Sequence, residues 1–244
     1  MTSNRVVWLA ENDAPESFPD VENALSEPDG LLAAGGDLSP ARLLSAYTRG
    51  IFPWYEEGQP VLWWSPDPRC VLWPAELHVS RRLRQQIRNS NADVRFNQAF
   101  SKVVRQCAGE RRSQQGTWIT ADMMQAYELL HRDGWAHSIE IWDDGNLAGG
   151  LYGICIGKVF FGESMFSSTP NTSKMAMLGL ARHMVSAHLE LIDCQVVSRH
   201  LITLGARLMP RTEFSAFLER ACNPPDRHED WPREPIPVAD LCVA

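Results

Sequence analysis

The sequence predicts a mixed α+β fold: a small, loop-rich N-terminal domain followed by a larger domain with a mostly antiparallel central sheet. Residues 17–60 are rich in turn-forming residues around one clear helix, and further along three strand-like stretches are joined by tight turns. Between these regions the WWSPDPR segment interrupts regular structure, because each proline disfavours helix at the residue before it. We place the domain boundary there, which gives domains at residues 1–67 and 68–244.

The helix of the N-terminal domain is expected between residues 39 and 50. Ser39 is a candidate N-cap, Pro40 suits the first helical position, and Gly50 can end the helix. The apolar stripe of this helix is formed by Leu43, Leu44 and Tyr47.

The larger domain changes from helical to strand-like periodicity. RRLRQQIRNS, AFSKVVRQCAGE and a segment capped by Thr120 are predicted helices, and AHSIEIWD, LAGGLYGICIG and VFFGESMF are predicted strands of a meander. A helix near 172–188, a strand at LELIDCQVV and a helix near 212–221 follow. This β-β-β-α-β-α order is typical of the acyl-CoA N-acetyltransferase fold, although a fold alone does not define a function. The proline-rich residues 223–244 are expected to form an extended tail, either along the surface or loose.

Composition argues against several classes of protein. The 244 residues include no stretch approaching the ~18 apolar residues of a membrane span and no leader-like start, so a cytoplasmic protein without a membrane partner is expected. Six cysteines without CxxC spacing and seven histidines without HExxH spacing predict reduced thiols and no metal. The net charge of −7 argues against a protein that coats nucleic acid with its whole surface.

Basic residues are nevertheless concentrated between residues 80 and 112. Nine of them oppose two acidic residues, a local charge of +7. They are Arg81, Arg82, Arg84, Arg88, Arg95, Lys102, Arg105, Arg111 and Arg112. This segment is either a solvated helical face or a phosphate-binding patch, whose affinity for nucleic acid falls steeply with salt.

Polar residues interrupt two strongly apolar strands. Glu163 lies in GESMF, and a buried carboxylate there has to be paired or functional. Asp193 and Gln195 of DCQ are expected on one face of their strand, with Cys194 on the other. Two alternatives remain open: a purely structural hydrogen-bonded pair, and a Cys194 thiol nucleophile with His200 or His183 as its base. The second is disfavoured because a free cysteine usually behaves as a small buried hydrophobe.

Aromatic residues suggest a nucleobase site and a link between the domains. Trp54 in FPW and Trp118 in GTWIT stand at the ends of elements, where two exposed rings can sandwich a base. Trp63 and Trp64 are interpreted as a clamp, with one ring packed into each domain.

Nine motifs occur in order along the chain: GLLAAGGDLSPARLLSAYTRGIFPW, LWWSPDPRCVLWP, GTWIT, AHSIEIW, GGLYG, FGESMFS, NTSKMA, LIDCQ and LGA. Over roughly residues 17–210 the chain therefore resembles the bacterial leucyl/phenylalanyl-tRNA–protein transferases. The resemblance implies an enzyme that moves leucine or phenylalanine from its tRNA to the N-terminal Arg or Lys of a protein and thereby marks that protein for degradation. It implies aminoacyl-tRNA and such acceptor proteins as partners and no cofactor, and we expect a monomer.

The resemblance also implies roles for individual residues. Trp54 and Trp118 match the aromatics that hold the terminal adenosine, while Glu163, Asp193 and Gln195 match the polar groups around the reacting ester and amine. The positions at or beside the aminoacyl pocket are Leu151, Phe160, Met165, Met177, Leu180, Met184 and Ile192. By their residue types alone, most of these are more typical of a hydrophobic core, and they form a pocket only if a polar group such as Glu163 or Asp193 stands at its rim. The expected contacts to the tRNA backbone are Arg81, Arg82, Arg84, Arg88, Arg111 and Arg112. Ser198 stands where some relatives are expected to have Asn.

The chemistry of the residues agrees with this resemblance. An aminoacyl ester is already activated, so attack by an amine needs proximity and a proton acceptor rather than ATP, metal or CoA. Our hypothesis is that Asp193 orients Gln195 and polarises the amine, while Glu163 holds the amine end. A flexible, Met-rich pocket is expected to accept Leu, Phe and Met and to disfavour β-branched Val and Ile.

Two other functions fit less of the sequence. A CoA-dependent N-acetyltransferase cradles pyrophosphate with a glycine-rich loop at a helix N-terminus, whereas SSTPNTSK before the long helix has no glycine. A non-catalytic RNA-binding module leaves Glu163, Asp193 and Gln195 without a role.

Overall fold

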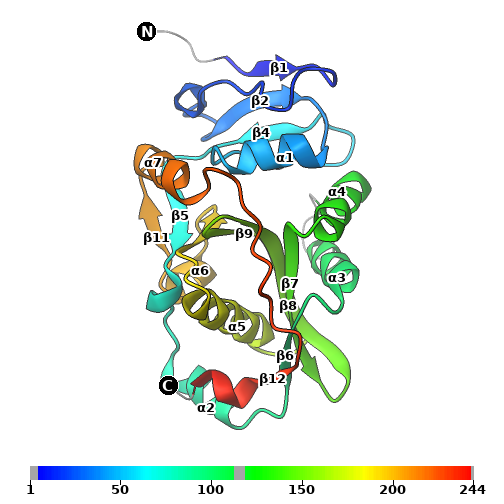
Figure 1. Cartoon of the computed structure of the whole chain (residues 1–244), viewed down its shortest axis with the longest axis vertical. Coiled ribbons are helices and arrows are strands. Elements are labelled where there is room, and N and C mark those ends of the chain that lie inside the picture. The colour runs from blue at the N-terminus through cyan, green and yellow to red at the C-terminus, as the bar shows by residue number, and fades with distance from the viewer. Residues whose placement is uncertain (1–4, 113–118, 243–244) are drawn as a thin grey trace.

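The structure is a computed structural model that describes residues 5–112 and 119–242. It contains a four-stranded and an eight-stranded sheet, which follow one another along the long axis of the molecule (Figure 1). The chain passes from the first sheet to the second between β4 (Leu62–Trp64) and β5 (Arg69–Leu72). The predicted mixed α+β class is therefore confirmed.

The N-terminal sheet has the order β1-β2-β4-β3. Its other strands are β1 (Val7–Leu9), β2 (Leu31–Gly35) and β3 (Phe52–Pro53). The predicted helix is α1 (Pro40–Tyr47), in which the Ser39 hydroxyl caps the first turn by accepting from the Arg42 N–H. Gly50 follows with φ of +74°, a conformation that glycine adopts without strain, and leads the chain into β3. A 3₁₀ turn, η1 (Val21–Asn23), precedes β2.

The large sheet has the order β11-β5-β10-β9-β8-β7-β6-β12, and of its pairs within the described residues only β9–β10 is parallel. This confirms the mostly antiparallel sheet. The three predicted strands of the meander are β7 (Ala136–Asp143), β8 (Asn146–Ile156) and β9 (Val159–Ser167). The other strands are β6 (Asp93–Phe96), β10 (Leu191–Gln195), β11 (Arg207–Met209) and β12 (Ile236–Pro237).

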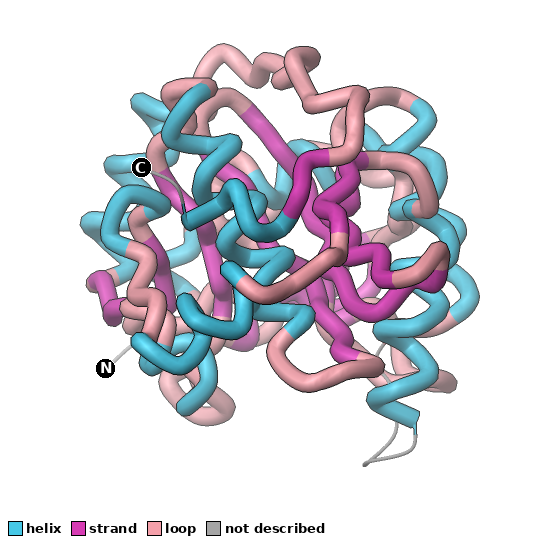
Figure 2. Tube along the Cα trace, turned by 90° about the horizontal axis from the view of Figure 1, so that it is seen from below, coloured by secondary structure: helices cyan, strands magenta, loops and turns pink. Residues whose placement is uncertain are grey.

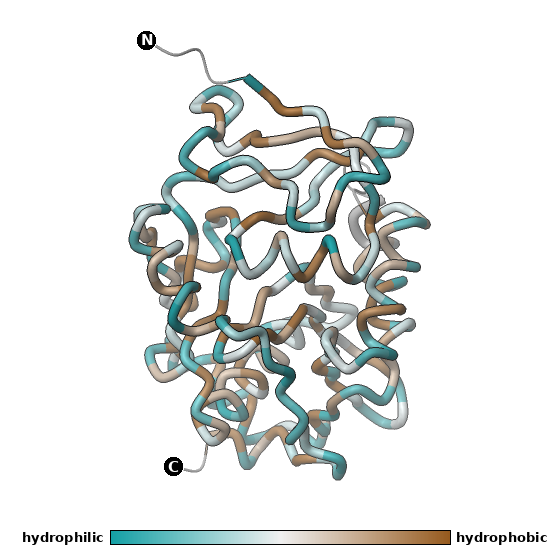
Figure 3. Tube along the Cα trace, turned by 45° about the horizontal axis from the view of Figure 1, so that its top comes forward, coloured by the Kyte–Doolittle hydropathy of each residue, from teal (hydrophilic) through white to brown (hydrophobic). Residues whose placement is uncertain are grey.

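Helices cover both faces of this sheet (Figures 1 and 2). α3 (Phe100–Arg112) and α4 (Ala121–Arg132) pack on one face, and α5 (Thr172–Ser186) packs on the other. Alternate side chains of β8 serve the two faces: Tyr152 joins the core cluster of α3 and α4, and Leu151 joins that of α5. Hydrophobic segments accordingly follow the interior strands, while the outer loops are hydrophilic (Figure 3).

The remaining helices are short. They are η2 (Pro74–Glu76), α2 (Arg81–Arg88), α6 (Arg199–Thr203), α7 (Arg211–Ala221) and η3 (Val238–Cys242). The chain after residue 222 crosses the front of the molecule in Figure 1, but it does not remain an extended tail, because β12 pairs with β6 and Val238 and Leu241 of η3 are buried in the core cluster beside α5. Trp231 anchors this segment by stacking on His137, with ring centroids 4.2 Å apart.

The helices and the cysteines can be compared with the expectations of no membrane span and of reduced thiols. No helix within residues 5–112 and 119–242 has the length and apolar character that crossing a membrane requires. All six cysteines lie in the described residues and are free thiols.

Candidate active site

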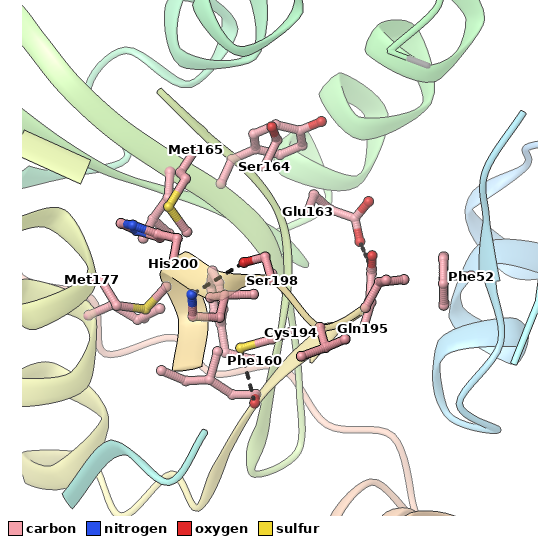
Figure 4. A pocket seen from close by; sticks show the side chains of 18 of the residues that line it. Phe52, Phe160, Glu163, Ser164, Met165, Met177, Cys194, Gln195, Ser198 and His200 are labelled. Carbon is pink, nitrogen blue, oxygen red and sulfur yellow. Dashed lines mark hydrogen bonds between the residues drawn. The ribbon is translucent and has the colours of Figure 1, made fainter. Parts of the chain in front are cut away.

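A pocket of about 350 Å³ opens between β3 of the N-terminal sheet and the β8–β9–β10 region of the large sheet. Glu163 and Gln195 point toward one another on the side of Phe52, and Met165 and Met177 lie on the opposite side (Figure 4). The pocket therefore has a polar end beside the N-terminal sheet and an apolar part against α5.

Glu163 is the centre of the polar end. Its side chain is almost fully buried, and its Oε1 accepts a 2.8 Å hydrogen bond from Gln195 Nε2. The hydroxyl groups of Tyr47 and Tyr127 lie 2.6 Å from Oε1 and Oε2, respectively. Burial raises the pKa of Glu163 to about 7, although the hydrogen bonds from Tyr127, Tyr47 and Gln195 act in the opposite direction.

Local backbone geometry turns Gln195 toward Glu163. The pairing of β10 with β5 shifts register between Asp193 and Gln195, and Gln195 has φ of +60°. At a bulge the strict alternation of side chains is lost. As a result Cys194 and Gln195 both line the pocket, which corrects the expectation that they lie on opposite faces.

Asp193 lies behind the pocket wall and does not line it. It is fully buried in a two-point ion pair with Arg69, with Nε 2.8 Å from Oδ1 and Nη2 2.7 Å from Oδ2. Oδ1 also accepts the Gln195 N–H at 2.9 Å. In this geometry Asp193 does not reach an amine in the pocket, which contradicts the hypothesis that it polarises the amine directly.

Arg69, the partner of Asp193, makes further contacts that fix its guanidinium group. Arg69 donates from Nη1 to the carbonyl oxygen of Gly50 at 3.0 Å, and its guanidinium lies 4.7 and 4.9 Å from the ring centroids of Phe52 and Phe214. The ion pair thus ties β10 to the segment that follows α1. Because both charges are buried, each depends on the other for compensation.

The apolar part contains six of the seven side chains named from the resemblance: Leu151, Phe160, Met165, Met177, Leu180 and Ile192. The seventh, Met184, does not line the pocket but is fully buried in the α5 core cluster. Cys194 is also at the wall, and its pKa is raised well above the usual value, first by a hydrogen bond with Cys70 and second by burial. A neutral thiol is a poor nucleophile, which argues against Cys194 as the reacting group.

Trp54 stands at the pocket mouth with 43% of its surface exposed. Its carbonyl oxygen accepts a 2.6 Å hydrogen bond from Trp64 Nε1, and the two ring centroids are 5.8 Å apart. Trp64 thus supports Trp54 within the N-terminal sheet, and Trp63 is buried there against Phe18. The predicted clamp, with one ring in each domain, is therefore wrong.

The second predicted stacking residue, Trp118, lies outside the described residues. Two residues further along the chain, Thr120 is described, and its Oγ1 lies 3.2 Å from Tyr55 Oη. Thr120 also caps α4, as predicted, by accepting from the Met123 N–H.

The predicted basic patch is distributed over separate elements. Arg81, Arg82, Arg84 and Arg88 are exposed on α2, at the end of the molecule opposite the N-terminal sheet (Figure 1). Arg111 and Arg112 end α3, and nothing is described of their side chains. Arg95 forms an ion pair with Asp93, with Nη2 3.4 Å from Oδ2.

Three residues of the site were not identified from the sequence as functional: Arg69, Tyr47 and Tyr127. The sequence indicates Tyr47 only as part of an apolar stripe and Arg69 only as part of the WWSPDPR turn segment. The one signal for these three residues is the presence of Glu163 and Asp193 in apolar strands, because a buried carboxylate requires buried hydrogen-bond donors around it. Among the described residues, no three or more His, Cys, Asp or Glu side chains cluster as a metal site.

Two family models match the chain. The one described as the N-terminal domain of leucyl/phenylalanyl-tRNA protein transferase matches residues 36–67, and the one described as leucyl/phenylalanyl-tRNA protein transferase matches residues 71–219. The chain belongs to this family. It is thus an aminoacyltransferase enzyme with leucyl- or phenylalanyl-tRNA and an acceptor protein as substrates, as the resemblance implied.

Full-length relatives carry the same name. The leucyl/phenylalanyl-tRNA–protein transferase of Chromohalobacter salexigens is 54% identical over 236 residues, which cover 97% of this chain and 91% of that protein. The transferase of Pseudomonas aeruginosa PAO1 is 53% identical over 215 residues, which cover 88% of this chain and 94% of that protein.

Two solved structures resemble the transferase more distantly. The C-terminal domain of a putative lysylphosphatidylglycerol synthetase from Agrobacterium fabrum has a TM-score of 0.43 at 9% identity, and the match covers 73% of this chain and 65% of that one. A GCN5-related N-acetyltransferase from Kribbella flavida has a TM-score of 0.32 at 9% identity, with coverage of 70% and 61%. Both scores are low, so the family assignment rests on the sequence relatives.

Proposed function

We propose that this transferase acts in the cytoplasm on proteins with an N-terminal Arg or Lys, and that adding leucine or phenylalanine marks them for degradation. The observation that carries the proposal is that one pocket combines an apolar part with a polar end. The apolar part suits the side chain of the donor amino acid. The polar end, where Glu163 is the acidic group, suits the cationic first residue of the acceptor.

The pocket residues bring the two substrates together. Attack of the acceptor's α-amino nitrogen on the ester carbon forms the peptide bond, the bond to the ribose oxygen breaks, and a proton from the amine ends on that oxygen. Because the Gln195 amide nitrogen donates to Glu163, its amide oxygen is the end offered to the amine as a hydrogen-bond acceptor. Gln195 thereby orients the neutral amine for attack.

Asp193 acts through Gln195 in this proposal. Its Oδ1 fixes the Gln195 N–H and so stabilises the left-handed backbone conformation that aims the amide into the pocket. Arg69 holds Asp193 in turn. The ion pair is thus a positioning device rather than part of the reacting set.

The terminal adenosine of the tRNA is proposed to stack between Trp54 and Trp118. The hydrogen bond between Tyr55 and Thr120, each of which lies near one of these tryptophans in the chain, supports this arrangement. Trp54→Ala is expected to weaken binding of an aminoacyl-adenosine analogue by about 1–3 kcal/mol, or about 5- to 150-fold, because one stacking surface is lost. The melting temperature should hardly change, since Trp54 is 43% exposed. Calorimetric titration and thermal denaturation measure the two effects.

Trp64→Ala is the matched comparison. It removes the hydrogen bond to the Trp54 carbonyl oxygen and part of the sheet packing. Affinity and melting temperature should therefore fall together. Unchanged affinity in Trp54→Ala would place the adenosine elsewhere.

The exposed arginines of α2 are proposed to contact the tRNA backbone. Arg82→Ala should weaken tRNA binding and reduce the slope of log affinity against log salt by about one, because one phosphate contact is lost. Lys158→Ala is the control, since Lys158 is an exposed cation on the β8–β9 turn, away from α2. Filter binding across a salt series measures the slopes. Equal slopes in both variants and the unaltered enzyme would remove α2 from the tRNA interface.

The side chains of the pocket set the choice of donor. Met165 and Met177 are flexible, so the pocket is proposed to accept Met besides Leu and Phe, and to disfavour Val and Ile by crowding near Cβ. Discrimination should be graded, because one methylene contributes only about 1–3 kcal/mol.

A transfer assay tests the whole proposal. The enzyme is mixed with labelled Phe-, Leu-, Met- or Val-tRNA and with peptides that differ only in a first residue of Arg, Lys or Ala. We expect labelled peptide with the Arg and Lys acceptors and with the first three donors. Equal transfer to the Ala peptide would contradict the proposed acceptor class.

A further inference from the structure

Glu163, Tyr47 and Tyr127 form a closed ring of short contacts. The two tyrosine oxygens are 2.6 Å apart, Tyr47 Oη is 2.6 Å from Glu163 Oε1, and Tyr127 Oη is 2.6 Å from Oε2. The three groups come from α1, α4 and β9, and both tyrosines are fully buried. The two tyrosine hydroxyl groups are therefore shielded from solvent, and the ring meets the pocket only at Glu163.

Counting hydrogens shows what the ring requires. Two oxygen atoms 2.6 Å apart need a hydrogen between them, because otherwise lone pairs face each other. The ring has three such contacts, and the two tyrosines supply only two hydrogens. An ionised Glu163 leaves one contact without a hydrogen, whereas a protonated Glu163 supplies the third and satisfies the whole ring.

We propose that Glu163 carries a proton in the unliganded enzyme, shared in this ring with Tyr47 and Tyr127, and releases it when the cationic side chain of an acceptor's first residue enters the pocket. The carboxyl O–H bond breaks, the proton passes to solvent buffer, and the resulting carboxylate pairs with the guanidinium or ammonium group. This inference rests on the proposed N-terminal Arg or Lys acceptor.

The surroundings of Glu163 agree with a neutral resting state. Burial raises its pKa to about 7. Burial first, and the charge on Glu163 second, raise the pKa values of Tyr47 and Tyr127 well above normal, so both keep their hydrogens. The ring of Tyr152 on β8 packs against Tyr127 at 5.5 Å.

Compensating charge is scarce around this carboxyl group. Asp193 on β10 and Arg69 on β5 are already paired with each other. Among the described residues that line the pocket, none is Lys or Arg, and burial lowers the pKa of the lining histidine, His200, which disfavours its charged form. A carboxylate would therefore stand buried without a cation until the acceptor arrives, which is costly.

Infrared difference spectroscopy of the unliganded enzyme tests where the proton lies. The spectrum of the unaltered enzyme minus that of Glu163→Gln should show the C=O band of a carboxylic acid below neutral pH, fading as the pH rises through about 7. The substitution is isosteric and keeps the hydrogen-bonding capacity of the site. A carboxylate band already present at about pH 6 would overturn the proposal.

Glu140 offers a matched control within the same sheet. It is fully buried on β7 and accepts from Ala99 N, Ser138 Oγ and Trp142 Nε1 at 2.7, 2.8 and 2.9 Å. Each of these contacts brings its own hydrogen, so no further proton is needed. Glu140→Gln should produce no carboxylic-acid band over the same pH range, and such a band would undermine the counting argument.

Calorimetric titration in buffers of different ionisation enthalpy tests whether Glu163 releases its proton when the acceptor binds. Near pH 6, an Arg-initiated peptide should release about one proton more from the unaltered enzyme than from Glu163→Gln, and an Ala-initiated peptide should show no such difference. Below the pKa of Glu163, the dissociation constant for the Arg peptide should rise by about tenfold for each unit by which the pH falls. Normal transfer to Arg peptides without proton release would overturn the inference and leave the proposed function intact. Absence of transfer to Arg and Lys peptides would instead overturn the proposed function, and the infrared band would still decide where the proton lies.

Discussion

Asp193→Ala is expected to destabilise the protein by about 3–5 kcal/mol, because it leaves the Arg69 guanidinium buried without a counter-charge. Arg69 is 1% exposed, so solvent cannot take over the lost contacts. The variant also removes the acceptor of the Gln195 N–H. Misplacing the Gln195 amide by about 1 Å is expected to slow transfer by about 10² or more. Urea unfolding and single-turnover transfer measure the two effects.

Two further variants separate stability from function. Replacing the pair with apolar residues, as Arg69→Met with Asp193→Leu, should recover most of the stability, because neither charge is then left unpaired. Transfer should stay low, since the Gln195 N–H still lacks its acceptor. Lys158→Ala, which breaks a pair exposed at 57% and 35%, should cost no more than about 1 kcal/mol. Recovery of full transfer in the double variant would show that Asp193 only maintains the fold.

Gln195→Met is expected to lower the rate constant of transfer by about 10²–10⁴ while the melting temperature changes little. Methionine is similar in volume but offers no amide oxygen to the amine and no donor to Glu163. The lost hydrogen bond costs only about 1 kcal/mol of stability. Rapid-quench measurement with preformed Phe-tRNA complex and saturating Arg peptide isolates the transfer step from binding.

Val197→Ala is the control for Gln195→Met, because Val197 lines the same pocket two residues further along and is 50% exposed. It should transfer at nearly the normal rate. A normal rate in Gln195→Met, or an equal loss in both variants, would remove the amide from the reaction.

The sequence was most informative where structure is local. The alternating pattern of β7, β8 and β9, and the capping residues Ser39 and Thr120, predicted elements that the structure contains. The strands of the N-terminal sheet escaped prediction because they span two to five residues and depend on partners far along the chain. Propensity and periodicity carry little signal over so short a length.

The site was predicted in its residue types but not in its geometry. The sequence singles out Glu163 and Gln195 as polar residues in apolar strands, and in the structure their side chains meet in the pocket. Strand alternation predicts one face for Asp193 and Gln195, but the bulge between them turns Gln195 into the pocket while Asp193 stays behind the pocket wall. Its partner Arg69 is 124 positions away, and nothing local to either residue indicates that they pair.

The position of the acceptor amine tests the central claim most directly. The complex to determine contains a non-hydrolysable amide analogue of phenylalanyl-adenosine and an Arg-initiated peptide. We predict the peptide's α-amino nitrogen about 2.7–3.2 Å from Gln195 Oε1, with the phenyl ring between Met165 and Met177. An amine bound outside the Glu163–Gln195 end of the pocket, with the phenyl ring still seated in its apolar part, would contradict the account.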